Sequence, residues 1–252
     1  MAEVSWSDQF QRGTTNIKWC EDVVARHAHS DWIAEYYNFW SNLAFCFAGL
    51  IGMKRCVELK LTGAFWAAEV VMCFGIGFGS MIFHAHQSKV SQNFDEILMS
   101  MLLMAHLHTL KDATLWLTPS KGKRAPLYYW YHIWVAAYWA IYAYTNVYEH
   151  FNIGFTIQAI CVFLLLFDVG MRFNHSQQKW YASVGSLVIA KVIWGFERKH
   201  YEEGTCDSPG ALAYHPLWHV GAALSHYFAM QQCAELLEIH RSGKSGSGKK
   251  ID

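Results

Sequence analysis

The sequence has few charged residues and no net charge, and both shortages narrow what the protein can do. Charged residues make up 16% of its 252 residues, against about 25% in typical soluble domains. Lysine and arginine together number 20, as do aspartate and glutamate. A neutral chain lacks the positive field with which proteins attract nucleic acids. We therefore expect no nucleic-acid partner.

The sequence also lacks a signal peptide, an internal repeat and a visible domain boundary. Its first residues, MAEVSWSDQFQRG, contain no apolar core of the kind that a signal peptide needs. We expect a single domain over residues 1–236 that opens with a short N-terminal segment. Residues 237–252, which end in SGKSGSGKKID, are expected to form a disordered tail.

Long apolar segments are present instead. Hydrophobic residues make up 53% of the chain, with 12 tryptophans and 13 tyrosines, although the mean hydropathy is only +0.09. A membrane-spanning helix needs about 20 mostly apolar residues. Seven segments approach this description, and the first, third and sixth are the most polar: Ile33–Met53, Gly63–Phe83, Phe94–Leu110, Tyr128–Tyr144, Ile153–Met171, Trp180–Phe196 and Ala211–Gln231. We predict an all-α fold, an integral membrane bundle of seven transmembrane helices.

The loop charges predict an orientation for this bundle. Lysine and arginine collect on the cytosolic side of multi-pass proteins, and here most of them fall on the side of the C-terminus. The prediction is a cytosolic C-terminus and a luminal N-terminus. The terminal KKID resembles the dilysine retrieval signal that coat proteins read, which indicates an endoplasmic reticulum or Golgi membrane. The alternative interpretation is a basic tail without a signal.

Polar residues from three separate segments are expected at the luminal ends of their helices. Ser80 and His84 lie one helical turn apart near the end of the second segment, and Asp95 opens the third. His215 and His219 lie at the start of the seventh segment, four residues apart, so they share one helix face. The intervening proline, Pro216, suits the first turn of a helix.

This constellation has the composition of a catalytic zinc site. Three protein ligands, here His84, His215 and His219, leave a fourth position on the metal for water. Zinc lowers the pKa of such a water to about 7. Asp95 would then accept the proton of this water, and Ser80 would bond to the water or to the developing oxyanion. Histidine is common in the chain, with 14 copies, and His106 and His108 are examples to which we assign no ligand role.

The same residues resemble a known family. The pattern GxGSxxFH at Gly77–His84, then Asp95, then HPLWH at His215–His219, is similar to the alkaline ceramidases, which belong to a superfamily of seven-span membrane hydrolases that includes the adiponectin receptors. Further matches are WCE at Trp19–Glu21, IAEYYNFWSN at Ile33–Asn42 and IWGFE at Ile193–Glu197. The resemblance implies hydrolysis of the ceramide amide, with zinc held by the three histidines and assisted by Ser80 and Asp95.

A calcium site near the N-terminus is implied only weakly. The family builds it from an aspartate before the tryptophan, a glutamate, an asparagine and a later glutamate. Trp19, Glu21 and Glu35 fit this pattern, but Lys18 stands where the aspartate would be and Val23 where the asparagine would be. Calcium takes 6–8 oxygen ligands, and an ammonium group opposes it. In addition, Glu197 replaces an aspartate that is frequent after the tryptophan of the sixth segment.

Cysteines and glycines give two further expectations. Of the seven cysteines, Cys20 and Cys206 are the two on the luminal side, where an oxidising environment permits a disulfide between them. The alternative is a pair of free thiols. Gly75 and Gly79 form a small-residue face for close helix packing, which we expect to help bring His84 toward the seventh segment. No strand precedes them, so they do not indicate a dinucleotide cofactor.

The predicted function is therefore zinc-dependent hydrolysis of ceramide inside a membrane. Two other classes share the scaffold: a non-enzymatic receptor or sensor with a structural zinc, and a small transporter, for which we would expect polar residues at mid-membrane on several helices. Glu69, Asp168 and Lys191 are ionisable residues within apolar segments, where such residues are functional candidates. For Lys191 the sequence suggests no role.

Overall fold

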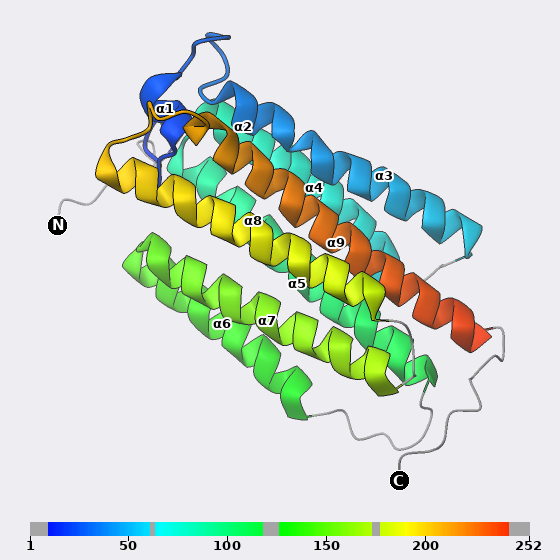
Figure 1. The fold of residues 1–252 in the computed structure, drawn as a ribbon. Helices are drawn as coiled ribbons and strands as arrows, with labels where there is room; N and C mark the ends of the chain where they lie inside the picture. Colours follow the sequence, from blue (N-terminus) through cyan, green and yellow to red (C-terminus); the bar gives the residue numbers. More distant parts are fainter. Residues whose placement is uncertain (1–9, 61–63, 118–125, 173–176, 242–252) are drawn as a thin grey trace.

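The computed structural model describes residues 10–60, 64–117, 126–172 and 177–241, and the regular elements in these residues are helices (Figure 1). In chain order they are α1 (Cys20–Val24), α2 (Tyr36–Ser41), α3 (Leu43–Glu58), α4 (Ala64–His86), α5 (Lys89–Leu117), α6 (Pro126–Thr145), α7 (Tyr148–Arg172), α8 (Gln178–Glu203) and α9 (Ala211–Arg241). The all-α prediction is confirmed.

Each predicted apolar segment coincides with helical structure. The first segment is divided between α2 and α3, which meet at Asn42. Two stretches are long and apolar enough to cross a membrane by composition, Trp66–His86 in α4 and Tyr148–Asp168 in α7. No other stretch of the described residues meets both the length and the hydropathy that this test requires. The number of membrane spans is therefore not established by composition.

One expectation about a helix start needs correction. The helix α9 begins at Ala211, so Pro216 lies inside it and not in its first turn. The same helix continues to Arg241, and the domain boundary at residue 236 stays a prediction. The terminal KKID lies outside the described residues.

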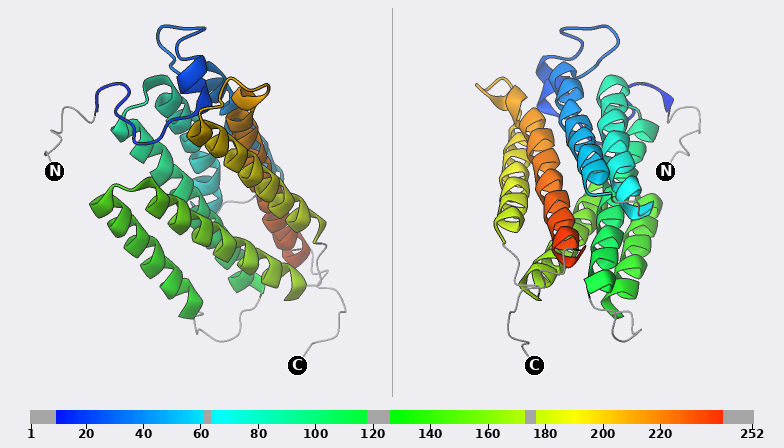
Figure 2. Two further views of the ribbon diagram at one scale, coloured as in Figure 1. Left: turned by 60° about the vertical axis from the view of Figure 1, so that its left-hand side comes forward. Right: turned by 90° about the vertical axis from the view of Figure 1, so that its right-hand side faces the viewer.

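The long helices run roughly antiparallel in an elongated bundle (Figure 2). The helices α8 and α9 lie side by side along their length, α4 packs between α3 and α5, and α6 pairs with α7. The short helix α1 covers one end of the bundle, and α9 ends at the other (Figure 1). We call the α1 end the upper end of the bundle and the opposite end the lower end.

Tight turns at the upper end bring distant parts of the sequence together. Gln87 joins α4 to α5 with a φ of 50°. Gly204 ends α8 with a φ of 68°, and Gly210 precedes α9 with a φ of 86°, conformations that glycine adopts without steric cost. The last turn of α4, the last turn of α8 and the first turns of α9 consequently meet at the same level.

Polar side chains gather inside the bundle and large apolar ones outside it. One buried network links α5, α6 and α7: Gln158 accepts hydrogen bonds from Ser100 at 2.9 Å and Tyr138 at 2.5 Å. Large apolar side chains face outward from the long helices: Phe47, Phe78, Met101, Ile141, Leu164, Ile189 and Leu224. An apolar exterior of this extent is unusual for a monomer in water.

Candidate metal centre

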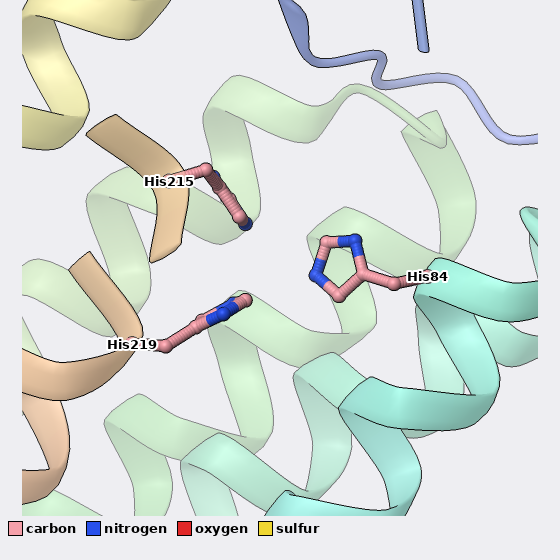
Figure 3. Close-up of side chains that lie close together, drawn as sticks. All are labelled: His84, His215 and His219. Carbon is pink, nitrogen blue, oxygen red and sulfur yellow. The ribbon is translucent and has the colours of Figure 1, made fainter. Parts of the chain in front are cut away.

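Three histidine rings meet at the upper end of the bundle. His84 comes from the last turn of α4, and His215 and His219 come from the first turns of α9. The centroid of the His84 ring lies 5.0 Å from the centroid of each of the other two rings, and those two centroids are 4.5 Å apart. All three residues are buried, and one ligand atom from each lies within 4.8 Å of the others. Figure 3 shows the rings turned toward a common space.

Each of these rings is held from behind by an oxygen atom. The partners of the Nδ1 atoms are Glu35 for His84, Glu197 for His215 at 2.9 Å, and Ser41 for His219 at 2.7 Å. The Ser41 hydroxyl donates to the Asn38 carbonyl at 2.9 Å, so its oxygen accepts from the ring N–H of His219. Oxygen partners of this kind fix the tautomer and the orientation of metal-binding histidines.

The consequence is that three Nε2 atoms carry lone pairs toward one another. Nε2 of His84 is buried and has no hydrogen-bond partner in the described part of the chain. A buried nitrogen without a partner is costly, and a metal ion bound to all three Nε2 atoms removes this cost. The donor set therefore fits a divalent metal such as zinc, which accepts imidazole nitrogen.

Ser80 and Asp95 lie near the three histidines. Ser80 is one turn before His84 on α4, Asp95 is on the neighbouring α5, and the Ser80 hydroxyl lies close to the Asp95 carboxyl. Both are buried, and Oδ1 of Asp95 has no hydrogen-bond partner among the described residues. The two side chains line the same cavity as His215 and His219. Their catalytic roles stay predictions.

The neighbouring helix that the small-residue face of α4 admits is α5. A Cβ at Gly79 would lie 2.5 Å from a methyl carbon of Leu98, and one at Gly75 would lie 3.3 Å from the same side chain. At a third glycine, Gly77, a Cβ would lie 2.6 Å from Sγ of Cys46 on α3. Glycine therefore admits the neighbours of α4 on two sides, and this close packing brings Asp95 near Ser80.

The residues predicted for calcium are bound to protein groups. Both oxygens of Glu21 accept backbone N–H groups, from Tyr37 at 2.7 Å and Asn38 at 2.9 Å. Burial raises the pKa of the Glu21 carboxyl, which disfavours its charged form. Glu35 accepts from Gln87 at 2.7 Å in addition to its bond with His84. These carboxylates act as hydrogen-bond acceptors for the surrounding helices.

Cations of the protein occupy the neighbourhood where calcium was expected. Asp22 lies 3.5 Å from the Lys18 ammonium and 3.2 Å from the Arg26 guanidinium. Val23 is 58% exposed and offers no side-chain oxygen. The donor set does not fit calcium, because its carboxylates already have N–H or cationic partners and its remaining positions are an ammonium and an alkyl group.

A disulfide ties the N-terminal segment to the site. Cys20 and Cys206 are bonded, with their Cα atoms 5.0 Å apart, as the sequence predicted. The Cys20 N–H also donates to Glu197 at 3.3 Å, and the other oxygen of Glu197 binds His215. The residue before this cysteine is Trp19, and the centroid of its ring lies 3.9 Å from the centroid of the His215 ring. The covalent bond thus positions a segment that covers one ligand candidate.

A long cavity runs from the histidines into the bundle. Its empty volume is about 1140 Å³, including its open mouth. Along α9 it extends from His215 to Ala229, which corresponds to roughly 21 Å at 1.5 Å per residue. Most of its lining is apolar or aromatic, with Phe151, Phe155 and Phe163 from α7 and Leu102 and Leu103 from α5. A long apolar chain could lie along it with a polar group near the histidines.

Lys191, which had no assigned role, lines this cavity. Its Nζ donates to Oδ1 of Asn152 at 2.6 Å and lies 3.7 Å from the centre of the Trp194 ring. The Trp218 ring is 5.7 Å away. Cation–π contacts of this kind stabilise an ammonium group in apolar surroundings, so its partners account for the position of Lys191.

Sequence reasoning missed the residues that hold the rings. Ser41 lies inside the segment Ile33–Asn42 but was given no role of its own. Glu35 was assigned to calcium, and Glu197 was noted only as a departure from the family pattern. Each contacts a histidine from another helix or loop, so local spacing could not reveal the pairing. The available signal was that all three are polar residues in otherwise apolar or aromatic stretches.

Comparisons with known proteins agree with this geometry. A model of the Ceramidase family matches residues 11–250. An alkaline ceramidase of Arabidopsis thaliana is 25% identical over 227 residues, which cover 86% of this chain and 81% of that protein. Alkaline ceramidase 1 of Mus musculus is 32% identical over 99 residues, which cover 38% of this chain and 35% of the mouse protein.

The family match includes α1 to α9 and every residue of the histidine centre. It also confirms the resemblance carried by the ordered motifs around His84, Asp95 and His215. The chain belongs to the Ceramidase family.

Proposed function

We propose that the protein hydrolyses the amide bond of a ceramide and releases a sphingoid base and a fatty acid. In this proposal His84, His215 and His219 hold a zinc ion. The observation that supports the proposal is the convergence of three buried imidazole rings. The Nδ1 atom of each ring has an oxygen partner, which leaves the Nε2 atoms for the metal. This arrangement leaves three ligands with one lone pair each, the number typical of catalytic zinc sites.

The neighbouring residues provide the rest of an amidase. A bound zinc supplies a water whose pKa is lowered to about 7. Asp95 accepts a proton from the attacking water and returns it to the leaving amine. The Ser80 hydroxyl donates a hydrogen bond to the oxygen of the scissile carbonyl. Ser80 and Asp95 both line the cavity next to His215 and His219.

The proposed substrate is a lipid because of the shape and lining of the cavity. The cavity extends along α9 from His215 to Ala229, and ligand pockets of proteins are lined mostly by apolar and aromatic side chains with a few polar groups. Its apolar walls would take an acyl or sphingoid tail, and its polar upper end would take the amide. The match to alkaline ceramidases favours ceramide over other lipid amides.

We also propose that the bundle forms one domain that crosses the membrane seven times. α2 with α3 would make the first span, and each of α4 to α9 would make one more. The large apolar side chains on their outer faces support contact with lipid. The N-terminus and the centre would face the lumen of the endoplasmic reticulum or Golgi, where a disulfide persists. The C-terminus would be cytosolic, with KKID available to coat proteins.

Calcium has no part in the proposal. The Lys18 ammonium and the Arg26 guanidinium supply positive charge next to Asp22. Glu35 orients His84 through a direct hydrogen bond, so this glutamate supports the centre without a second ion.

The test is a ceramide hydrolysis assay on the purified protein in detergent, with zinc measured in the same samples. We expect fatty acid release that a chelator abolishes and zinc restores. His84→Ala, His215→Ala and His219→Ala should each lose the hydrolysis and the zinc of this centre together. The matched control is His86→Ala, because His86 lies on the same turn of α4 but is exposed.

Two results would overturn the proposal. Zinc at wild-type levels in all three variants would reject the ligand assignment. A protein that holds zinc but never hydrolyses ceramide would favour a receptor or sensor in which the metal is structural.

A further inference from the structure

A second cluster of potential metal ligands lies deeper in the bundle. Glu69 of α4, His106 of α5 and His226 of α9 each place one ligand atom within 4.8 Å of the others. Their exposed fractions are 0%, 2% and 8%. None of these residues belongs to the histidine centre, and our sequence analysis gave His106 no ligand role.

Two polar atoms of this cluster have no hydrogen-bond partner among the described residues. They are Oε2 of Glu69 and Nε2 of His226, and both are buried. The remaining contact is the hydrogen bond between Nδ1 of His106 and Oε1 of Glu69. An ion pair between His106 and Glu69 would explain that contact, but it would leave both other atoms unsatisfied. Buried polar atoms without partners cost free energy, so the cluster is incomplete without a ligand.

A buried thiol lies nearby but on another side of His106. Sγ of Cys233, two turns after His226 on α9, lies 4.0 Å from Nε2 of His106, whereas Glu69 contacts Nδ1 of the same ring. The potential ligands that lie together are therefore one carboxylate and two imidazoles, and zinc accepts both kinds of donor.

The charge of the cluster also favours a cation. Glu69 is a fully buried carboxylate, and in the described part of the chain its ion-pair partner is His106. A carboxylate away from water needs compensation by positive charge or hydrogen bonds. A divalent ion would compensate Glu69 and satisfy His226 at once.

The cavity offers a route to this position. It is lined by His219 at its upper end and by both His106 and His226 further down. His226 follows His219 by seven residues on α9, which is two turns or roughly 10 Å along the helix axis. An ion that reaches the histidine centre can therefore reach the second cluster along the same cavity.

We propose that Glu69, His106 and His226 form a second metal site for zinc or a similar divalent transition metal. The ion would join α4, α5 and α9 below the histidine centre and close the lower part of the cavity. This assignment does not depend on the hydrolysis proposed above.

The test measures the number of metal ions per chain in the full-length protein, purified with an affinity tag that contains no histidine. Elemental analysis should find two zinc ions per chain in the wild type and in His86→Ala. We expect one in His226→Gln, and one in the double variant His84→Ala/His215→Ala. A wild type with a single zinc that His226→Gln retains would overturn the proposal, as would complete loss of zinc from the double variant.

Discussion

The two histidine clusters share helices α4 and α9 but differ in what their acidic residues can do. Each cluster is buried along one cavity. In the upper cluster Glu35 and Glu197 stand behind the rings and bind Nδ1. In the lower cluster Glu69 also binds Nδ1 of a ring, that of His106, but its second oxygen is buried without a hydrogen-bond partner among the described residues. A carboxylate that only orients a ring leaves the coordination shell open, whereas one with an unpaired oxygen can also serve as a ligand.

The residues next to the two clusters also differ. Ser80 and Asp95 line the cavity beside the upper rings and could act on a substrate there. The lower cluster instead lies further down the cavity, where the buried Cys233 thiol is its neighbour. The comparison indicates that similar sets of side chains serve chemistry at one end and cohesion at the other.

Replacement of Asp95 should have the largest effect on this comparison. Asp95→Asn keeps the shape of the side chain but cannot accept the proton, so we expect kcat to fall about 10²–10⁴-fold, the range for loss of a general base. Zinc content should stay at the wild-type value, because Asp95 is not among the three ligands. The measurement is the rate of fatty acid release together with elemental analysis.

Asp207→Asn, an exposed residue in the loop before α9, is the control and should leave the rate unchanged. Loss of one zinc from Asp95→Asn would show instead that Asp95 is a ligand, and the division between chemistry and metal binding at the upper cluster would fail.

Matched changes of the two carboxylates should give effects of different kinds. Glu197→Gln removes a charged acceptor behind His215, and loss of such support lowers metal affinity or activity about 10–100-fold. Glu69→Gln should instead remove the second zinc and lower the unfolding temperature. Zinc titrations and thermal unfolding curves of both variants distinguish these outcomes. Equal effects of the two variants on hydrolysis and on unfolding would show that the clusters do not differ in role.

The upper cluster is also the one tied by a covalent bond, and removing that bond tests how far it depends on the N-terminal segment. Disulfides typically contribute about 2–4 kcal/mol to stability, and each kcal/mol shifts the unfolding temperature of a chain this size by roughly 2–4 °C. We expect this loss in Cys20→Ser, in Cys206→Ser and, to the same extent, in the double variant. Cys161→Ser should unfold as the wild type does. Additive losses in the double variant would contradict a bond between the two cysteines.

The sequence predicted the helices and the upper cluster, because both leave local signals. Apolar segments of about 20 residues define helices, and four-residue spacing puts His215 and His219 on one face. The partners behind the rings were not predictable in this way. Ser41 and His219 are 178 positions apart, and their contact exists only because the bundle brings α2 beside α9.

The lower cluster was missed for a related reason. Glu69 was flagged as an ionisable residue in an apolar segment, and His106 was set aside as an ordinary helical histidine. The overlooked signal was His226, which follows His219 by seven residues and so lies near the same face of α9. Only the packing of α4 and α5 against that face shows that Glu69 and His106 meet it.

Added calcium should have the smallest effect on stability. An unchanged unfolding temperature would show that the cations of the protein itself neutralise this segment without a bound ion. Addition of calcium to the wild type should not change the unfolding temperature, because Lys18 and Arg26 already neutralise Asp22 and Glu21 is engaged by two N–H groups. Lys18→Asp replaces the ammonium by a carboxylate, and we expect this variant to be stabilised by calcium but not by magnesium. A ligand at 100 times its Kd stabilises the folded state by about 2.7 kcal/mol, which thermal unfolding detects. Saturable stabilisation of the wild type by calcium would contradict this expectation, because calcium would then have displaced the cations and N–H groups that contact Asp22 and Glu21. Glu35 would in that case connect His84 to a second metal ion and not only to a network of hydrogen bonds.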